Sequence, residues 1–238
     1  MKTMDKNLLI ELNNYNVGKI KVSHTKNSDL ALQNKYIFFP GFDIVEFPEG
    51  INWNYKHNHA AGTYQIYLHC LTIVRNLVNS YLMTKMDVYI KKAREIIIQW
   101  MTSSSNETYY SKNSSWRDHS SARRMKTIIY FQQNSPEDYK IDENLFEELL
   151  VKHCDFLSRK EFYAENNHGM MSDEGLLFLS CYLTNESLSN LYRQTSVLRM
   201  ERMILKLFSS KGYNLENSPE YHRVTQNIAS DFIKLTKY

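Results

Sequence analysis

Beyond Trp53, apolar residues recur at intervals of three and four positions, which is the period of an α-helix. The stretches with this period cover residues 67–81, 89–100, 117–132, 145–157, 172–183, 187–208 and 219–237. Only 7 Gly and 4 Pro occur in 238 residues, too few for the many tight turns of a β-barrel or β-sandwich. The sequence therefore predicts an all-α domain of seven helices stacked as hairpins.

Two regions differ in pattern along the chain. Residues 1–52 lack helical periodicity and contain turn signals at Pro40-Gly41 and Pro48-Glu49-Gly50. We therefore predict an irregular N-terminal arm over residues 1–52 and a helical domain over residues 53–238. Helix starts are marked by Asp142, a predicted N-cap, and by Ser218 followed by Pro219 at the first helical position.

Composition and charge restrict the class of protein. Hydrophobic residues make up 42% and charged residues 23%, as in a folded globular domain, and the net charge of +3 permits an anionic ligand without indicating nucleic acid. The three cysteines, Cys70, Cys154 and Cys181, are odd in number and far apart, so they are expected to be buried thiols. No apolar run has the length of a membrane span or a signal peptide. We expect a cytoplasmic protein, or an exported one whose signal has been removed, with no membrane contact.

One candidate site is the run from Glu165 to Gly169, which contains Asn166, Asn167 and His168. Two amides and an imidazole beside a glycine supply hydrogen-bond donors and acceptors on a backbone that a ligand can approach closely. The alternative is a helix-connecting loop in which Asn and Gly adopt left-handed conformations, and spacing alone favours this alternative.

A second candidate is the segment from Gly212 to His222, where Tyr221 and His222 fall in the first turn of the last predicted helix. The positive end of a helix dipole favours anions at this position. The alternative is an ordinary helix cap followed by a half-buried aromatic residue.

Two further clusters have other possible uses. Trp116, with Arg123 nearby, suits a carboxylated sugar, because guanidinium grips carboxylate through two hydrogen bonds and an indole can cover a sugar ring. The same cluster fits a surface ion-pair face, or more weakly a phosphate-backbone site. His57 and His59 are close enough to begin a metal site, but no carboxylate or cysteine has matching spacing. We therefore predict no metal, no cofactor and no nucleic-acid partner.

Taken in order, these motifs resemble the N-terminal helical toroid of the heparinase II/III and alginate lyase-like families. The series runs from Ile51-Asn52-Trp53 through Trp100, Trp116 and Arg123 to Asn167-His168-Gly169, then to Gly212, Glu216, Ser218 and Tyr221-His222. Asn167 and Tyr221 are 54 positions apart, similar to the separation of the family's carboxylate-neutralising Asn and its catalytic Tyr. The resemblance implies an incomplete (α/α) toroid.

The resemblance also implies a reaction, the β-elimination of acidic, uronate-containing polysaccharides. Asn167 and His168 would neutralise the substrate carboxylate, and Tyr221 would act as general base, general acid or both. Trp116, Arg123, His222 and Glu216 would bind or orient the sugar chain.

The sequence departs from the family pattern in two respects. Lys211-Gly212 stands where the family has Asp-Gly, and the C-terminal β-sandwich of the family is expected to be absent from residues 1–238. Two alternatives to a lyase therefore remain. One is a non-catalytic or degenerate carbohydrate-binding helical module. The other is a helical interaction domain that self-associates through the face where the toroid is cut off.

Overall fold

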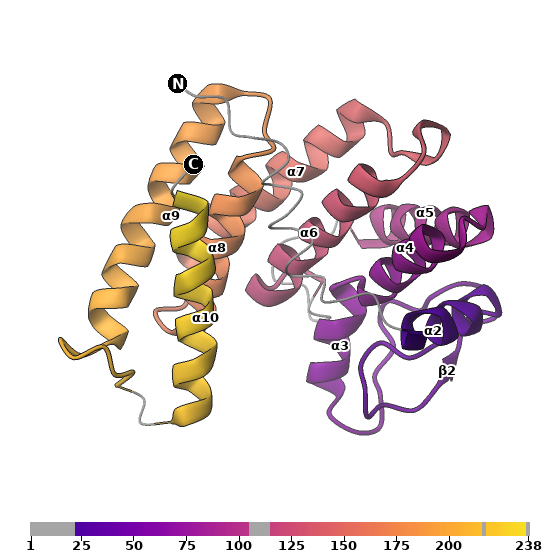
Figure 1. Cartoon of the computed structure of the whole chain (residues 1–238), viewed down its shortest axis with the longest axis horizontal. Helices are drawn as coiled ribbons and strands as arrows, with labels where there is room; N and C mark the ends of the chain where they lie inside the picture. Colours follow the sequence, from indigo (N-terminus) through magenta and orange to yellow (C-terminus); the bar gives the residue numbers. More distant parts are fainter. Residues whose placement is uncertain (1–21, 105–114, 216–217, 237–238) are drawn as a thin grey trace. The chain divides into compact units, whose positions relative to one another are not determined.

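The computed structural model describes residues 22–104, 115–215 and 218–236 (Figure 1). These residues form nine α-helices, two short 3₁₀ helices and one two-stranded antiparallel sheet of β1 (Lys35–Tyr36) and β2 (Val45–Glu46). The prediction of an all-α chain is confirmed. The elements fall into two compact units, which divide between residues 146 and 147.

The first unit is built around one buried helix, α4 (Thr72–Thr84), which packs against α2, α5 and α6. Its core includes Leu77, Val78, Ile97 and Ile128, none of which is exposed to solvent. The other elements of this unit are α2 (Val22–Leu32), α3 (Ala61–His69), α5 (Asp87–Ser104), α6 (Asp118–Asn134) and η1 (Glu137–Tyr139).

Two local features of this unit differ from the sequence-based prediction. The helix predicted over residues 67–81 is broken at Leu71, whose φ of 56° ends α3 and begins α4. The Leu71 side chain is fully buried, and this burial offsets the roughly 1–2 kcal/mol cost of the left-handed conformation. Helix α2 lies within the arm predicted to be irregular. It has no strong amphipathic pattern, and tertiary contacts hold it, including a 2.8 Å hydrogen bond between Ser28 and Ser80.

The second unit consists mainly of three helices in contact, with α8 (Asn167–Ser180) packed against both α9 (Glu186–Leu207) and α10 (Pro219–Thr236) (Figure 1). Helix α7 (Glu143–Ser158), in which the division between the units falls, and η2 (Lys160–Phe162) precede them. The predicted caps are confirmed. Asp142 accepts hydrogen bonds from two backbone N–H groups of α7, and Ser218 accepts one from Tyr221 at 3.5 Å.

The expectation that the three cysteines are buried thiols holds for two of them. Cys70 and Cys154 are buried, while Cys181 is partly exposed. In the described segments, none of the helices combines the length and apolarity needed to cross a bilayer.

Candidate active site

Asn167 and His168 lie in the first turn of α8, and not in a loop as predicted. Asn166 is the N-cap, with an extended φ of −151°, and its side-chain oxygen accepts a hydrogen bond from the His168 backbone N–H at 2.9 Å. Both side chains are partly exposed, and the first turn contains no acidic residue. Within this turn no acidic side chain competes with an anionic ligand for the positive end of the helix, and Glu165, just before the N-cap, is paired with Arg202 and Lys206.

Gly169 is required by close packing. Its φ is not in the left-handed region, which contradicts the expectation that this glycine serves a left-handed turn. A Cβ at this position would lie 2.1 Å from the carbonyl oxygen of Ala164 and 2.8 Å from Cζ of Tyr163. The first turn of α8 can therefore rest directly on the Tyr163 ring only because residue 169 has no side chain.

Tyr221 lies in the first turn of α10, and 48% of its surface is exposed. The next residue, His222, is held by its surroundings: the Asn214 backbone N–H donates to its Nδ1 at 3.2 Å, and its ring meets Phe208 edge-on. Because Nδ1 accepts this hydrogen bond, the proton of the neutral ring lies on Nε2. The Asn214 side chain donates in turn to Thr225 at 3.0 Å, which joins the α9–α10 connection to α10.

The two predicted catalytic segments are both anchored on the C-terminal turns of α9. Glu165, two residues before Asn167, forms ion pairs with Arg202 and Lys206 of α9. One residue later in the helix, Leu207 accepts a 2.9 Å hydrogen bond from the Leu215 backbone, next to the Asn214 that contacts His222. The Asn167 turn and the Tyr221 turn therefore lie at the same end of α9.

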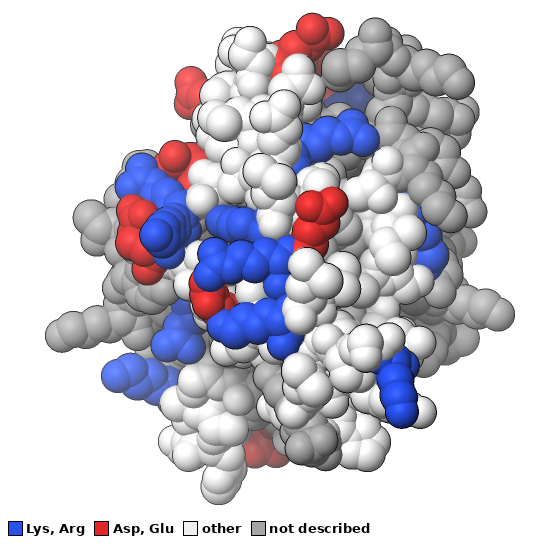
Figure 2. All heavy atoms as spheres, turned by 90° about the vertical axis from the view of Figure 1, so that its left-hand side faces the viewer, with Lys and Arg blue, Asp and Glu red and all other residues white. Residues whose placement is uncertain are grey.

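This part of the second unit is rich in basic side chains. Figure 2 views the molecule from the side on which Figure 1 draws α9, and it shows Lys and Arg side chains gathered there with carboxylates among them. Hydrogen bonding from Lys206 and the charge of Arg202 lower the pKa of Glu165, so this carboxylate stays ionised. Arg202 and Lys206 remain largely exposed, at 69% and 47% of their side chains, and can meet an anionic ligand.

The three remaining predicted site residues do not lie in the Asn167 or Tyr221 turns. Glu216 lies outside the described residues. Arg123, in the first unit, is exposed, and its role in binding stays a prediction. Trp116 is fully buried, so its indole has no face open to a sugar ring and its expected role in substrate binding does not fit the structure.

The burial of Trp116 has a clear cause in the core of the first unit. The guanidinium of the fully buried Arg124 stacks over Trp100 at 3.9 Å and over Trp116 at 5.1 Å. Arg124 also donates to the backbone carbonyls of His69 and Ser115, at 3.2 and 2.7 Å. An aromatic residue next to arginines, which suggested a sugar site, is here a cation–π core.

A buried polar cluster that the sequence pattern did not predict lies beneath the Asn167 turn. The Tyr163 hydroxyl donates to Oδ2 of Asp173 at 2.7 Å, and Nε of Arg199 donates to Oδ1 at 2.6 Å. Burial raises the pKa of Asp173 to about 7, against the opposing effects of Arg199 and Tyr163. The sequence contains one indication of this cluster. Asp173 lies three residues after Met170 and three before Leu176, a spacing that places its carboxyl on the buried face of α8.

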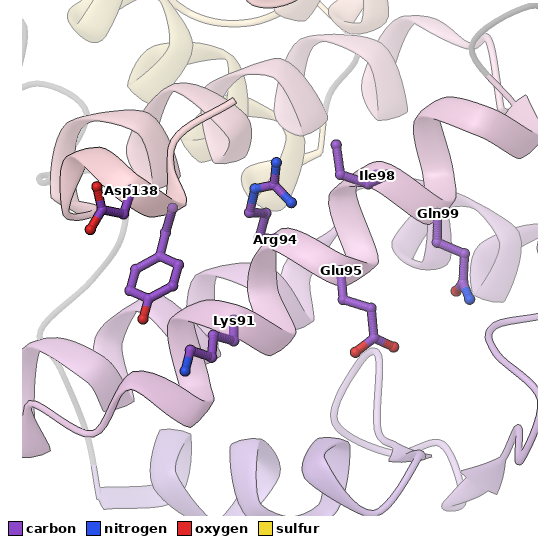
Figure 3. A pocket seen from close by; sticks show the side chains of 7 residues that line it. Lys91, Arg94, Glu95, Ile98, Gln99 and Asp138 are labelled. Atoms are coloured by element: carbon purple, nitrogen blue, oxygen red, sulfur yellow. The ribbon is translucent and has the colours of Figure 1, made fainter. Parts of the chain in front are cut away.

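A separate open hollow of about 700 Å³ lies in the first unit, between α5 and η1 (Figure 3). Two cations and two carboxylates are among its lining residues, so its charges balance and it does not select an anion. It contains none of the predicted catalytic residues. The lining consists of Lys91, Arg94, Glu95, Ile98, Gln99, Asp138 and Tyr139.

The two histidines considered for a metal site contact each other. His57 is buried, and its Nδ1 lies 3.1 Å from both the backbone nitrogen and the carbonyl oxygen of His59. Its ring stacks on Tyr64, with centroids 4.9 Å apart. Within residues 22–104, 115–215 and 218–236, no three His, Cys, Asp or Glu side chains are grouped as metal ligands.

The family model for the heparinase II/III N-terminus matches residues 2–238, nearly the whole chain. The chain belongs to this heparinase II/III family. A sequence search of curated proteins found no match. The order of motifs from Ile51 to His222 therefore identified the family correctly.

Solved structures of this family share the fold. The chain is similar to heparinase III, with a TM-score of 0.78 at 18% identity, over 93% of this chain and 36% of that one. It is similar also to the heparan sulfate lyase HepC of Pedobacter heparinus, with a TM-score of 0.75 at 21% identity, over 93% and 35% of the two chains. The chain thus spans about a third of the length of these lyases. The predicted fold class, an incomplete (α/α) toroid of helical hairpins, is confirmed.

Proposed function

We propose that this chain forms the helical part of a polysaccharide lyase, which binds an acidic, uronate-containing polysaccharide and cleaves it by β-elimination. One observation carries the proposal. Asn167 and His168 at the start of α8, and Tyr221 at the start of α10, are both anchored around the C-terminal turns of α9. The family membership and the names of the similar structures, a heparan sulfate lyase and a heparinase, support it.

The first requirement of β-elimination is to make the C5 proton of the uronate removable. The neighbouring carboxylate is already negative and resists further charge. Hydrogen bonds from the Asn167 amide and the His168 ring, together with the positive end of α8, neutralise this group so that it accepts charge as the proton leaves. The partial exposure of both side chains is compatible with such contact.

The second requirement is proton transfer at C5 and O4. Tyr221, as the phenolate, accepts the C5 proton. The C5–H electron pair forms the C4=C5 double bond, and the C4–O4 bond breaks with its electrons going to O4. Tyr221 then donates a proton to O4, which returns the phenolate without consuming water. His222, held by Asn214 and Phe208 beside this turn, would bind or orient the sugar chain, as the family resemblance implies. The binding roles of Arg123 and Glu216 stay predictions of that resemblance.

The test measures the ultraviolet absorbance of unsaturated uronate products from heparan sulfate and from alginate. Tyr221→Phe removes only the hydroxyl and is expected to abolish the signal. The matched control is Tyr213→Phe, because Tyr213 is also exposed, at 67%, and lies in the connection that leads from α9 to α10. Retained turnover in Tyr221→Phe, or equal loss in both variants, would remove Tyr221 from the mechanism.

A non-catalytic carbohydrate-binding module is the second candidate, because the exposed cations Arg202 and Lys206 beside the Asn167 turn favour an anionic polymer without requiring any proton transfer. It predicts that heparan sulfate binds without forming product. Asn167→Ala would then weaken binding, while Asn190→Ala, at another partly exposed asparagine of the same unit, would not.

Self-association is supported by a stripe of exposed leucines on α9. Leu191, Leu198 and Leu205 recur every seven residues and are 54%, 67% and 81% exposed. An apolar stripe of this kind favours contact with another surface. Size-exclusion chromatography of Leu198→Glu beside the unsubstituted chain tests the proposal, which predicts a smaller apparent mass for the variant.

A further inference from the structure

We propose that Tyr163, Asp173 and Arg199 are positioning residues of the lyase site, which hold the first turn of α8 and with it Asn167 and His168 in place for the substrate carboxylate. This inference rests on the proposed function of that turn. None of the three residues is expected to touch the substrate. They act through the backbone that carries the two donors.

Tyr163 connects the network to the turn directly. Its ring lies under Gly169, where a Cβ would come within 2.8 Å of Cζ and 2.9 Å of the hydroxyl oxygen. The same hydroxyl donates to Asp173, one turn further along α8, at 2.7 Å. Burial and the Asp173 charge raise the pKa of Tyr163, so the phenol keeps the proton that this bond needs. Tyr163 therefore contacts the first turn of α8 through its ring and the Asp173 carboxylate of the second turn through its hydroxyl.

Arg199 connects α8 to two other helices. Its guanidinium lies 4.1 Å over the Tyr163 ring and binds Asp173 from α9. It also donates to the carbonyls of Leu157 and Ser158 at the end of α7, at 2.9 and 3.1 Å. Unpaired carbonyls at a helix C-terminus favour a cation. A single side chain thus fixes the end of α7, the body of α8 and α9 to one another.

The chemistry explains why such rigidity matters at this turn. Apolar side chains could fill this space at lower desolvation cost, because buried ion pairs contribute little net stability. The hydrogen bonds of Asp173 with Tyr163 and Arg199 are directional, so they hold the first turn of α8 in one arrangement. Donors that stabilise a developing charge must be placed in advance, and a displacement of about 1 Å in such a site costs about a hundredfold in rate.

The first test measures amide hydrogen exchange in the intact chain, which needs no turnover. The reporters are the backbone amides of His168 and Met170, which donate to the Asn166 side chain and carbonyl at 2.9 and 3.3 Å. Tyr163→Phe, which removes one hydroxyl, should speed their exchange about five- to tenfold. Tyr192→Phe, at a buried tyrosine of α9, is the control and should leave exchange unchanged.

Asp173→Asn provides a second variant of the same shape and should act in the same direction. Equal exchange at His168 and Met170 in the unsubstituted chain and in both variants would overturn the proposal. Faster exchange throughout α8 and α9 would also overturn it, because the network would then be a general core contact.

The second test uses heparan sulfate turnover. Tyr163→Phe should lower kcat about tenfold or more while KM changes less than about twofold, since the donors act mainly on the transition state. Unchanged kcat beside an active unsubstituted chain would overturn the positioning role and leave the lyase proposal intact. If the unsubstituted chain neither binds nor cleaves the polymer, the proposed function fails, and the exchange comparison alone decides whether the network holds the turn.

Discussion

Nε of Arg199 donates to Oδ1 of Asp173 at 2.6 Å, and the Asp173 side chain has no exposure to solvent. The Arg199 side chain keeps only 17% of its own exposure. Removing one partner from such a pair leaves a buried charge without compensation, which is worse for stability than never having had the pair. We therefore expect the stability of the second unit to depend more on Arg199 than on Arg202, whose side chain is 69% exposed.

Above about pH 8, where Asp173 is ionised, Arg199→Met should lower the free energy of unfolding by about 3–5 kcal/mol, because the buried carboxylate would lose its cation. Urea denaturation followed by circular dichroism measures this change. Arg202→Met is the matched control on the same helix. Its side chain is 69% exposed in its pair with Glu165, so its loss is expected to be at most about 1 kcal/mol. Equal effects of the two substitutions would contradict the prediction.

Stability should depend on pH through Asp173. Burial raises the pKa of this carboxyl from 3.8 to about 7 in the folded chain, so the folded state binds its proton more tightly than the unfolded state. Its contribution is complete below about pH 4 and is lost as the pH rises to about 7, by up to about 1.4 kcal/mol for each unit of pKa difference. The difference in unfolding free energy between the unsubstituted chain and Asp173→Asn should fall over this window. A rise would mean that Arg199 outweighs burial.

Gly169→Ala should destabilise the chain by about 1–3 kcal/mol, because the new methyl group would meet the Ala164 carbonyl and the Tyr163 ring. Thermal unfolding measures the loss. Gly62→Ala in α3 is the control. A Cβ at Gly62 has no atom within 4 Å, and alanine favours a helix by up to about 1 kcal/mol. A neutral Gly169→Ala would show that the first turn of α8 is not tightly seated on Tyr163.

Trp116→Ala should lower the unfolding free energy by about 3–5 kcal/mol, as expected for a large aromatic residue in a core. Arg123→Ala, at an exposed position, should change it by less than about 0.5 kcal/mol. If Arg123 contacts the polymer, its substitution should instead weaken heparan sulfate binding in a pull-down or calorimetric titration. A stable Trp116→Ala with weakened binding would restore the indole as a sugar-binding residue.

Local signals in the sequence predicted most helices, because a helix buries one stripe of side chains and its cap residues act on the nearest backbone. Asp142 and Ser218 mark the starts of α7 and α10 correctly. Helix α8 begins at Asn167, five residues before the start that the apolar pattern predicts, because Asn167, His168 and Gly169 have the composition of a turn. Asn166 caps the helix, and residue 169 must be glycine because the Tyr163 ring leaves no room for a Cβ there.

The sequence by itself determined the helical class and the family, because periodicity and motif order depend only on the order of residues along the chain. The roles of Asn167 and Tyr221 stay predictions. Only the tertiary structure decided that Trp116 is core, that Leu71 breaks a helix, and that Asp173 meets Arg199. Each of these depends on contacts between segments far apart in sequence. A polar or aromatic side chain has the same letter whether it faces solvent or a buried partner, and only packing distinguishes the two.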